Sequence, residues 1–384
     1  MRNEKFDDMR PYCDEEISAA MQRISDSEYF PILSSFVYPG RDPEEIKAMI
    51  RAYTTIYEFQ SQVMATMNEQ IIARSIRRFS YAGLDCLDVG KRYLFISNHR
   101  DIMLDSSLLQ YILYSTGRRT TEITFGSNLM SSPLIIDVGK SNKMFKVVRG
   151  GNRKDFYTNS LHLSGYIHYA IKEKQESVWI AQRNGRTKDG IDATDQGIIK
   201  MFYMGASCSP AEALASLNIV PVAISYQWEP CDQLKALELY KSRSGKYVKQ
   251  PGEDLHSILT GVMQPKGDVH IHVGVPLSKN DLEPLSGLPN NLFNKQAALL
   301  IDKQIAQNYR LTCNNYIAQD IRSQKEQYAS CYTPEEKEKF MQHYRHVLDS
   351  EVEDKKALAD IFLGIYANPL LNKSKEYIME HAKV

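Results

Sequence analysis

The sequence predicts an α/β fold: a mixed, mostly parallel sheet covered by helices, with helical N-terminal and C-terminal regions. From about residue 85, short apolar runs typical of strands alternate with longer amphipathic segments, a rhythm that favours a sheet covered by helices. A hydrophobic content of 43% in 384 residues allows a sizeable core. We therefore expect a helical region at 1–82, an α/β domain at 83–280 and a helical region at 281–384.

The first region contains a helix start at Asp42-Pro43, where Asp42 caps and Pro43 has its backbone angle preset. Apolar residues then recur at helical spacing from Ile46 to Met67, and the helix either continues to Ile76 or breaks into two. Three arginines, Arg74, Arg77 and Arg78, end this segment. They are typical of cations at a helix C-terminus, but an amphipathic surface on anionic lipid is an alternative.

The α/β domain is predicted from its strands and helices in turn. Expected strands are 93–96, 123–125, 145–148, 178–181, 219–225 and 269–274, with helices at 104–114, 156–171 and 212–217. Between residues 226 and 268 the chain is less periodic, and we expect an excursion over the sheet edge. Beyond residue 277 helices are expected at 292–309, at 317–328 and from Thr333 onward.

Charge and hydropathy exclude several classes of protein. Lys+Arg and Asp+Glu both number 47, so global charge favours no nucleic-acid partner. No apolar run approaches the roughly 20 residues that span a bilayer. The start of the chain is acidic and polar rather than basic and then apolar, so we expect a cytoplasmic protein.

The strongest candidate for chemistry is His99, in the polar stretch Ser97–Asp101 directly after an apolar strand. Ligands bind at the carboxyl ends of strands in α/β sheets. A carboxylate that accepts a hydrogen bond from one ring nitrogen leaves the other nitrogen to take a proton from a substrate hydroxyl. Asp101 and Asp105 are both close enough in sequence to orient the ring, and the sequence alone leaves this choice open.

Two basic segments follow later strands. The first contains a glycine turn, Gly150-Gly151, among the cations Lys140, Lys143, Lys146, Arg149, Arg153 and Lys154. The second follows the strand 178–181 and contains Arg183, Arg186 and Lys188. Each is a plausible wall for an anionic group, through backbone N–H groups and charge-assisted bonds. A solvated basic face is the alternative for the first segment.

We expect no metal site. His270 and His272 alternate along one strand, and His343 and His346 lie on a later helix. Metal sites need further ligands, and no Cys, Asp or Glu stands at a suitable spacing.

Taken together, four blocks resemble the glycerolipid acyltransferase superfamily, which includes glycerol-3-phosphate and lysophosphatidate acyltransferases. The blocks are Asn98-His99 with Asp105, Arg149 with Gly150-Gly151-Asn152, Trp179-Ile180-Ala181 leading to Gly185-Arg186, and Ile219-Val220-Pro221-Val222. The family usually has four residues between its histidine and aspartate, whereas five separate His99 from Asp105. The third block has Gln182 and Arg183 where the family frequently has Glu.

The resemblance implies a transferase of phospholipid biosynthesis that needs no cofactor. His99, oriented by Asp105, would deprotonate a hydroxyl of glycerol-3-phosphate or a lysophospholipid, which attacks an acyl-carrier-protein or acyl-CoA thioester. Arg149, Arg186 and Lys188 would hold the acceptor's phosphate. Lys146 and Arg153 would meet the phosphate, the acidic carrier protein or the coenzyme A diphosphate. Such an enzyme would reach its lipid acceptor as a cytoplasmic protein in peripheral contact with the membrane.

Two alternatives accompany this interpretation. One is an O- or N-acyltransferase of a non-glycerol lipid such as an aminolipid. The other is a catalytically inactive lipid- or carrier-binding member of the fold, for which the irregular spacing between His99 and Asp105 is the best support.

Overall fold

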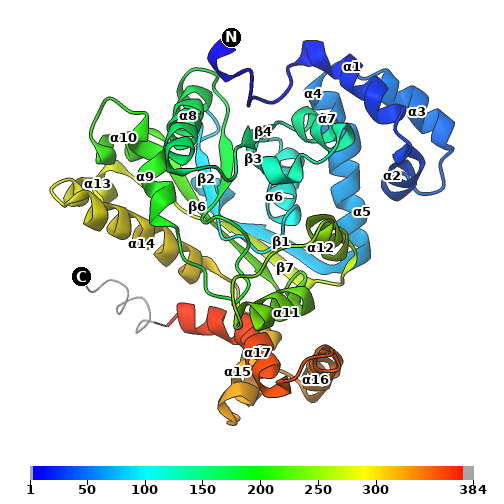
Figure 1. Cartoon of the computed structure of the whole chain (residues 1–384), viewed down its shortest axis with the longest axis vertical. Helices are drawn as coiled ribbons and strands as arrows, with labels where there is room; N and C mark the ends of the chain where they lie inside the picture. The colour runs from blue at the N-terminus through cyan, green and yellow to red at the C-terminus, as the bar shows by residue number, and fades with distance from the viewer. Residues whose placement is uncertain (1–2, 375–384) are drawn as a thin grey trace.

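The computed structural model describes residues 3–374. Within them, a seven-stranded mixed sheet has the order β1-β7-β6-β2-β5-β3-β4, with helices around it (Figure 1). The strands are β1 Ile76–Ala82, β2 Leu94–Ser97, β3 Glu122–Gly126, β4 Met144–Val147, β5 Val178–Ala181, β6 Ile219–Tyr226 and β7 Gly267–Val273. The predicted α/β class, with a mostly parallel sheet and helical ends, is confirmed.

The strand directions decide which loops can meet. Strands β6, β2, β5, β3 and β4 are parallel, while β7 is antiparallel to β6 and β1 is parallel to β7. The loops that follow β2, β5, β3 and β4 therefore leave the sheet at one edge. The residues that sequence reasoning singled out after β2 and β5 lie on adjacent strands of that edge.

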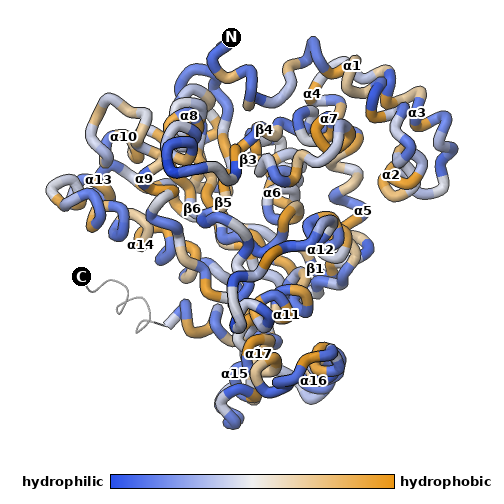
Figure 2. Tube along the Cα trace, in the orientation of Figure 1, coloured by the Kyte–Doolittle hydropathy of each residue, from blue (hydrophilic) through white to orange (hydrophobic). Residues whose placement is uncertain are grey.

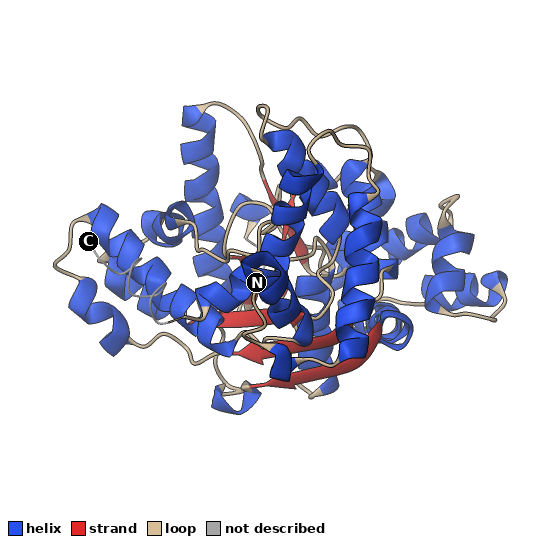
Figure 3. Cartoon of the chain, turned by 90° about the horizontal axis from the view of Figure 1, so that it is seen from below, coloured by secondary structure: helices blue, strands red, loops and turns tan. Residues whose placement is uncertain are grey.

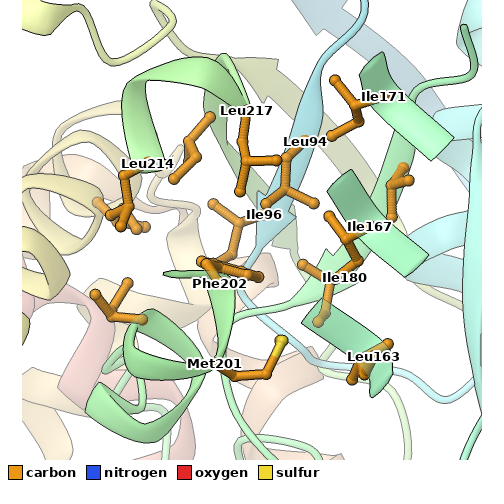
Figure 4. Packing of buried hydrophobic residues seen from close by; sticks show 14 of the residues in the cluster. Leu94, Ile96, Leu163, Ile167, Ile171, Ile180, Met201, Phe202, Leu214 and Leu217 are labelled. Carbon is orange, nitrogen blue, oxygen red and sulfur yellow. The ribbon is translucent and has the colours of Figure 1, made fainter. Parts of the chain in front are cut away.

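The two faces of the sheet pack into separate cores because successive side chains of a strand point to opposite sides. On β2, Leu94 and Ile96 join one core, whereas Phe95 joins the other. The first core contains residues of helices α8, α9 and α14, and Figure 4 shows Ile167 and Phe202 packed near Ile96. Each fully buried aliphatic side chain of this kind contributes about 1.5–3 kcal/mol.

The helices surround the strands (Figure 3), and the bounds of the longer ones follow. They are α1 Asp14–Ser25, α2 Phe30–Val37, α3 Pro43–Arg51, α5 Ala65–Ser75, α6 Leu104–Ser115, α7 Pro133–Ser141, α8 Arg153–Lys172, α9 Gln196–Met204, α10 Pro210–Ser216, α11 Asp232–Ser242, α12 Glu253–Met263, α14 Asn290–Asn308, α15 Cys313–Ser323, α16 Pro334–Leu348 and α17 Lys355–Asn372. The sequence predicted α6, α8, α10 and α14 closely, placed α15 four to five residues too late, and did not predict α1, α2, α7 or α9.

The N-terminal region is helical except at its end. The helix that starts after the Asp42 cap stops at Arg51, and the chain resumes as α4 Ile56–Glu58, the π-helix η2 Phe59–Met64 and α5. The segment from Ile46 to Ile76 is therefore broken into two helical stretches, as the second alternative expected. Residues 76–82 form β1, so the prediction of helix throughout 1–82 is wrong there.

Of the three arginines Arg74, Arg77 and Arg78, the last two lie in strand β1. Arg77 and Arg78 belong to β1 and both pair with Asp268, at the start of the neighbouring β7. Their expected place at a helix C-terminus is wrong. Only Arg74 lies in the last turn of α5.

Residues 226–268, expected to be irregular, contain two helices, α11 and α12. The last helices of the chain form their own core with α11, around Trp228, Phe340 and Phe362. They lie at the foot of the molecule in Figure 1. Thr333 forms the anticipated capping box with Glu336 at the start of α16.

Hydrophobic and hydrophilic residues alternate along most helices (Figure 2). In the part of the chain that the structure describes, no helix has the length and apolar character to cross a membrane.

Candidate active site

His99 lies in the loop after β2, and the two residues that precede it hold this loop to the sheet. Asn98 donates from Nδ2 to the carbonyl oxygen of Ile224 on β6 at 3.0 Å, and its Oδ1 accepts from the N–H of Ile224 at 2.8 Å. The N–H of Gln182, after β5, donates to the carbonyl oxygen of Ser97 at 2.8 Å. The loop at the end of β2 is therefore held from the strands on both sides.

Asp105 is the carboxylate that contacts the ring. Its Oδ2 lies 2.9 Å from Nδ1 of His99, whose side chain is 13% exposed. Oδ2 also accepts from the N–H groups of Arg100 and Asp101, at 2.6 and 2.9 Å, and Oδ1 accepts from the hydroxyl of Tyr226 at 2.9 Å. Four hydrogen-bond partners thus surround a fully buried carboxylate and fix its position. Within residues 3–374, Nδ1 makes the ring's hydrogen bond, which leaves Nε2 for a substrate.

The five-residue spacing is accommodated because the intervening loop curls around the carboxylate. Asp101 accepts from the N–H groups of Met103 and Leu104 at 2.9 and 2.8 Å and so satisfies the start of α6. Asp105, in the first turn of that helix, then faces back toward His99. Burial, followed by the nearby charge of Asp105, raises the pKa of Asp101. Asp105, and not Asp101, is therefore the carboxylate that contacts the ring of His99.

Arg100 faces the opposite way, into a buried ionic network. Its guanidinium bonds Asp192 at 2.6 Å and Glu229 at 3.2 Å. Lys235 bonds both Glu229 and the carbonyl oxygen of Arg100 at 2.6 Å. Burial lowers the pKa of Arg100, but the two carboxylates outweigh it and hold that pKa well above its usual range. The network joins the His99 loop to α11, and Arg100 also lies over the ring of Tyr309, after α14.

The loop after β5 lies beside the His99 loop, because the N–H of Thr187 donates to the carbonyl oxygen of His99 at 2.7 Å. Its polar groups are poorly satisfied. Within the described residues, both polar side-chain atoms of Gln182, the hydroxyl of Thr187 and Nη1 of Arg186 are buried without a partner. Nη2 of Arg186 donates to Ser257 on α12 at 3.2 Å. Unpaired buried polar groups cost free energy unless a ligand or water satisfies them.

Helix α12 covers these groups. Its residue Gly261 packs on the carboxylate of Asp101 so closely that an added Cβ would lie 2.1 Å from Oδ2. Ser257, one turn earlier on the same face, is the partner of Arg186. The His99 loop, the Arg186 loop and α12 therefore enclose one polar site.

The other predicted cations lie elsewhere. Lys188 is paired with Glu238 on α11. Arg149 follows β4, and its side chain turns back over Gly126 at the end of β3, where an added Cβ would lie 3.2 Å from its Nε. Lys146 is on β4 itself, and Arg153 is exposed at the start of α8. The structure thus brings Arg186 to the His99 loop, places the side chain of Arg149 over the end of β3, two strands from β2, and leaves Lys146 and Arg153 farther along the same edge.

The histidines of β7 are engaged with protein groups. Nδ1 of His270 lies 2.9 Å from the hydroxyl of Ser80, and burial lowers the pKa of His270 to about 4. His343 bonds Asp232 at 2.7 Å. In residues 3–374, no three His, Cys, Asp or Glu side chains gather in a way that could hold a metal ion.

Sequence reasoning missed several residues of the site. Tyr226 reaches Asp105 from the end of β6, and Asp192, Glu229 and Lys235 complete the network of Arg100. A tyrosine at the end of an otherwise apolar strand was a usable signal for Tyr226. The charged residues had none, because each lies in a polar stretch that is typical of a surface.

Comparison with known proteins adds little. No protein-family model matches the chain, and no curated protein matches it in sequence. Among solved structures, the chain is similar to the crystal structure of the 1-acyl-sn-glycerophosphate (LPA) acyltransferase PlsC from Thermotoga maritima. The two share 11% identity over 75% of this chain and 94% of that chain, with a TM-score of 0.34. A likeness of this size decides nothing about activity, which rests on the residues of the site.

Proposed function

We propose that the protein is an acyltransferase that moves an acyl group from a thioester to a hydroxyl of a phosphorylated lipid precursor, with His99 as the general base. The observation that carries the proposal is the 2.9 Å contact between Nδ1 of His99 and Asp105, beside a buried guanidinium nitrogen of Arg186 that has no partner among residues 3–374. A base of this kind suits a hydroxyl nucleophile, and the cation suits an anionic group on the same molecule.

The proposed reaction needs no covalent enzyme intermediate. Nε2 of His99 takes the proton of the acceptor hydroxyl, whose oxygen attacks the carbonyl carbon of the thioester. The carbon–sulfur bond then breaks, and the departing thiolate takes the proton back from His99. Asp105 holds the ring and stabilises the imidazolium that forms between the two steps.

Arg186 supports a phosphate-bearing acceptor, glycerol-3-phosphate or a lysophospholipid such as lysophosphatidate. Its Nη1 is buried and unpartnered in the described part of the chain, while Nη2 is fixed by Ser257. The hydroxyl of Thr187 and the amide of Gln182 offer further hydrogen bonds next to it. Acyl-CoA or acyl-carrier protein is the proposed donor, at a cytoplasmic membrane surface.

The test is a thioester-release assay that crosses both donors with a panel of acceptors. We expect thiol release that depends on glycerol-3-phosphate or lysophosphatidate and is abolished by His99→Ala. Arg186→Gln should raise the KM for the acceptor about 10- to 100-fold, the value of a charge-assisted bond of roughly 1.5–3 kcal/mol. Lys188→Gln is the matched control, because that lysine is already paired with Glu238. Full activity of His99→Ala would sink the proposal.

A second candidate is an O- or N-acyltransferase of a non-glycerol lipid. It is favoured by the pairing of Lys188 with Glu238 and by the exposed position of Arg153 at the start of α8, which leave fewer cations near His99 than the sequence predicts. Failure of both glycerol-3-phosphate and lysophosphatidate, with His99-dependent release on an aminolipid, would decide for it.

A further inference from the structure

Helix α12, which covers the candidate site, has an apolar face that the described residues leave largely exposed. Leu255, Leu259 and Met263 recur every four residues on the outer side of α12 and are 54%, 56% and 64% exposed. The opposite face is the one that contacts the site, through Ser257 and Gly261. These three side chains therefore add little to the core; α12 packs against α5 and lies between α6 and α11 in the view of Figure 1.

The segment that leads into α12 is strongly basic. Residues 241–252 contain four cations, Lys241, Arg243, Lys246 and Lys249, and no acidic residue, in a chain with no net charge. All four are exposed. Arg243 pairs with the exposed Asp354, where such a pair is weak, and Lys249 pairs with Asp254, which is partly buried at the start of α12. Val248, between the lysines, is 69% exposed.

A second patch of the same composition adjoins α12. Asp254 at its start accepts from Asn128 at 3.2 Å, and the neighbouring Ser127 accepts from the N–H of Arg149 at 3.0 Å. The loop that contains Arg149 leads into α8, where Phe156 and Tyr157 are 67% and 58% exposed. Cations and apolar side chains thus continue along the edge of the sheet where the site opens.

We propose that residues 241–263 dock this protein onto an anionic lipid bilayer, with Leu255, Leu259 and Met263 buried in the interface and Lys241, Lys246 and Lys249 facing the headgroups. A helix with an apolar face, flanked by cations, binds anionic membranes by both effects together. A second copy of the chain fits less well, because a two-fold contact would oppose the same cations.

Vesicle binding tests this surface without any acyl donor, so it succeeds or fails independently of the proposed activity. The full chain is sedimented with neutral phosphatidylcholine vesicles and with vesicles that contain phosphatidylglycerol. We expect binding to the anionic vesicles only. The pair Leu255→Ser and Leu259→Ser should weaken it about tenfold or more, and Lys241→Glu with Lys246→Glu should do the same.

The matched control is Ile32→Ser with Leu33→Ser on α2, two apolar residues that are 69% and 43% exposed away from the site. This variant should bind like the parent. Unchanged binding of the α12 variant, or equal binding to neutral vesicles, would overturn the proposal. So would binding lost in the α2 variant alone, or an α12-dependent dimer in light scattering.

A tryptophan reporter locates the contact. Trp179 and Trp228 are 3% and 8% exposed, so they respond little to a surface event. Leu259→Trp should shift its emission to the blue on anionic vesicles, and Ile32→Trp should not. An unshifted Leu259→Trp on bound protein would place the contact elsewhere and contradict the proposal.

Discussion

The two loops that form the candidate site differ in how completely their buried polar groups are paired. After β2, Asp105 has four hydrogen-bond donors and Arg100 has two carboxylates. After β5, Gln182, Thr187 and Arg186 keep buried atoms without a partner among residues 3–374. Within the described residues, the first loop leaves two buried atoms without a partner, Nε of Arg100 and Oδ2 of Asp101, whereas the second loop leaves five, on Gln182, Arg186, Thr187 and Asp192. The second loop therefore has more to gain when something polar enters.

The difference in pairing matches two different roles: the loop after β2 positions the base, and the loop after β5 binds the ligand. A base works when its geometry is fixed before the substrate arrives, which the first loop achieves with backbone and side-chain bonds. A binding group works when its hydrogen bonds are still available, at a cost in stability. Removing a charge should therefore have opposite consequences in the two loops.

Arg100→Met should show the largest effect. It leaves Asp192 without its guanidinium partner in a buried network, and breaking such a pair costs about 3–5 kcal/mol of unfolding free energy. Urea denaturation measures it. A loss below about 1 kcal/mol, typical of an exposed ion pair, would contradict the account of this loop.

Asp302→Asn should remove a pH dependence of stability. Burial raises the pKa of Asp302 to about 7 against hydrogen bonds from Thr194, which ends the second loop. Between its unfolded pKa near 3.8 and about 7, the folded protein binds the extra proton, so stability is greatest at the acidic end and falls as pH rises, by up to about 1.4 kcal/mol per pH unit. The Asn variant should lack this slope in denaturation curves between pH 4.5 and 7, roughly the window set by the two pKa values. An unaltered slope would contradict the prediction.

Tyr226→Phe should cost about 1–3 kcal/mol, because Oδ1 of Asp105 loses its hydroxyl donor and stays buried. Thiol release should slow about 3- to 10-fold, since the ring is held less firmly. Tyr93→Phe, at the other end of β2, is a matched control with its own hydrogen-bonded hydroxyl. The free energy of unfolding of Tyr93→Phe should fall, but the rate of thiol release per folded protein should equal that of the parent.

Arg186→Met should change stability least. It removes a buried guanidinium with one nitrogen that no described residue pairs, so we expect the free energy of unfolding to stay within about 1 kcal/mol of the parent or to rise. A loss as large as that of Arg100→Met would show that both loops serve the fold alike.

The sequence predicted the parts of this site that are local. An apolar strand followed by Asn98-His99 indicated the position of the base. The positions of β2 to β7 along the chain followed from their apolar runs. The strand β1 escaped because Arg77, Arg78 and Ser80 make it polar. Helix α12 escaped because its apolar stripe faces outward and Gly261 interrupts its inner face.

Long-range pairing was beyond the sequence. Nothing local distinguishes Arg186, whose Nη1 has no partner in the described structure, from Lys188, which Glu238 neutralises from 50 residues away. Arg100 lies in a polar stretch of the sequence, yet its side chain is fully buried. It is paired there with Asp192 and Glu229, which come from distant segments.

The central claim is that His99 and Asp105 act as one catalytic unit, and a double-mutant cycle on thiol release tests it most directly. His99→Ala and Asp105→Asn should each reduce the rate by about a thousandfold or more, and the double variant should be no slower than the slower single variant. Multiplying losses, or near-parental release from His99→Ala, would contradict it.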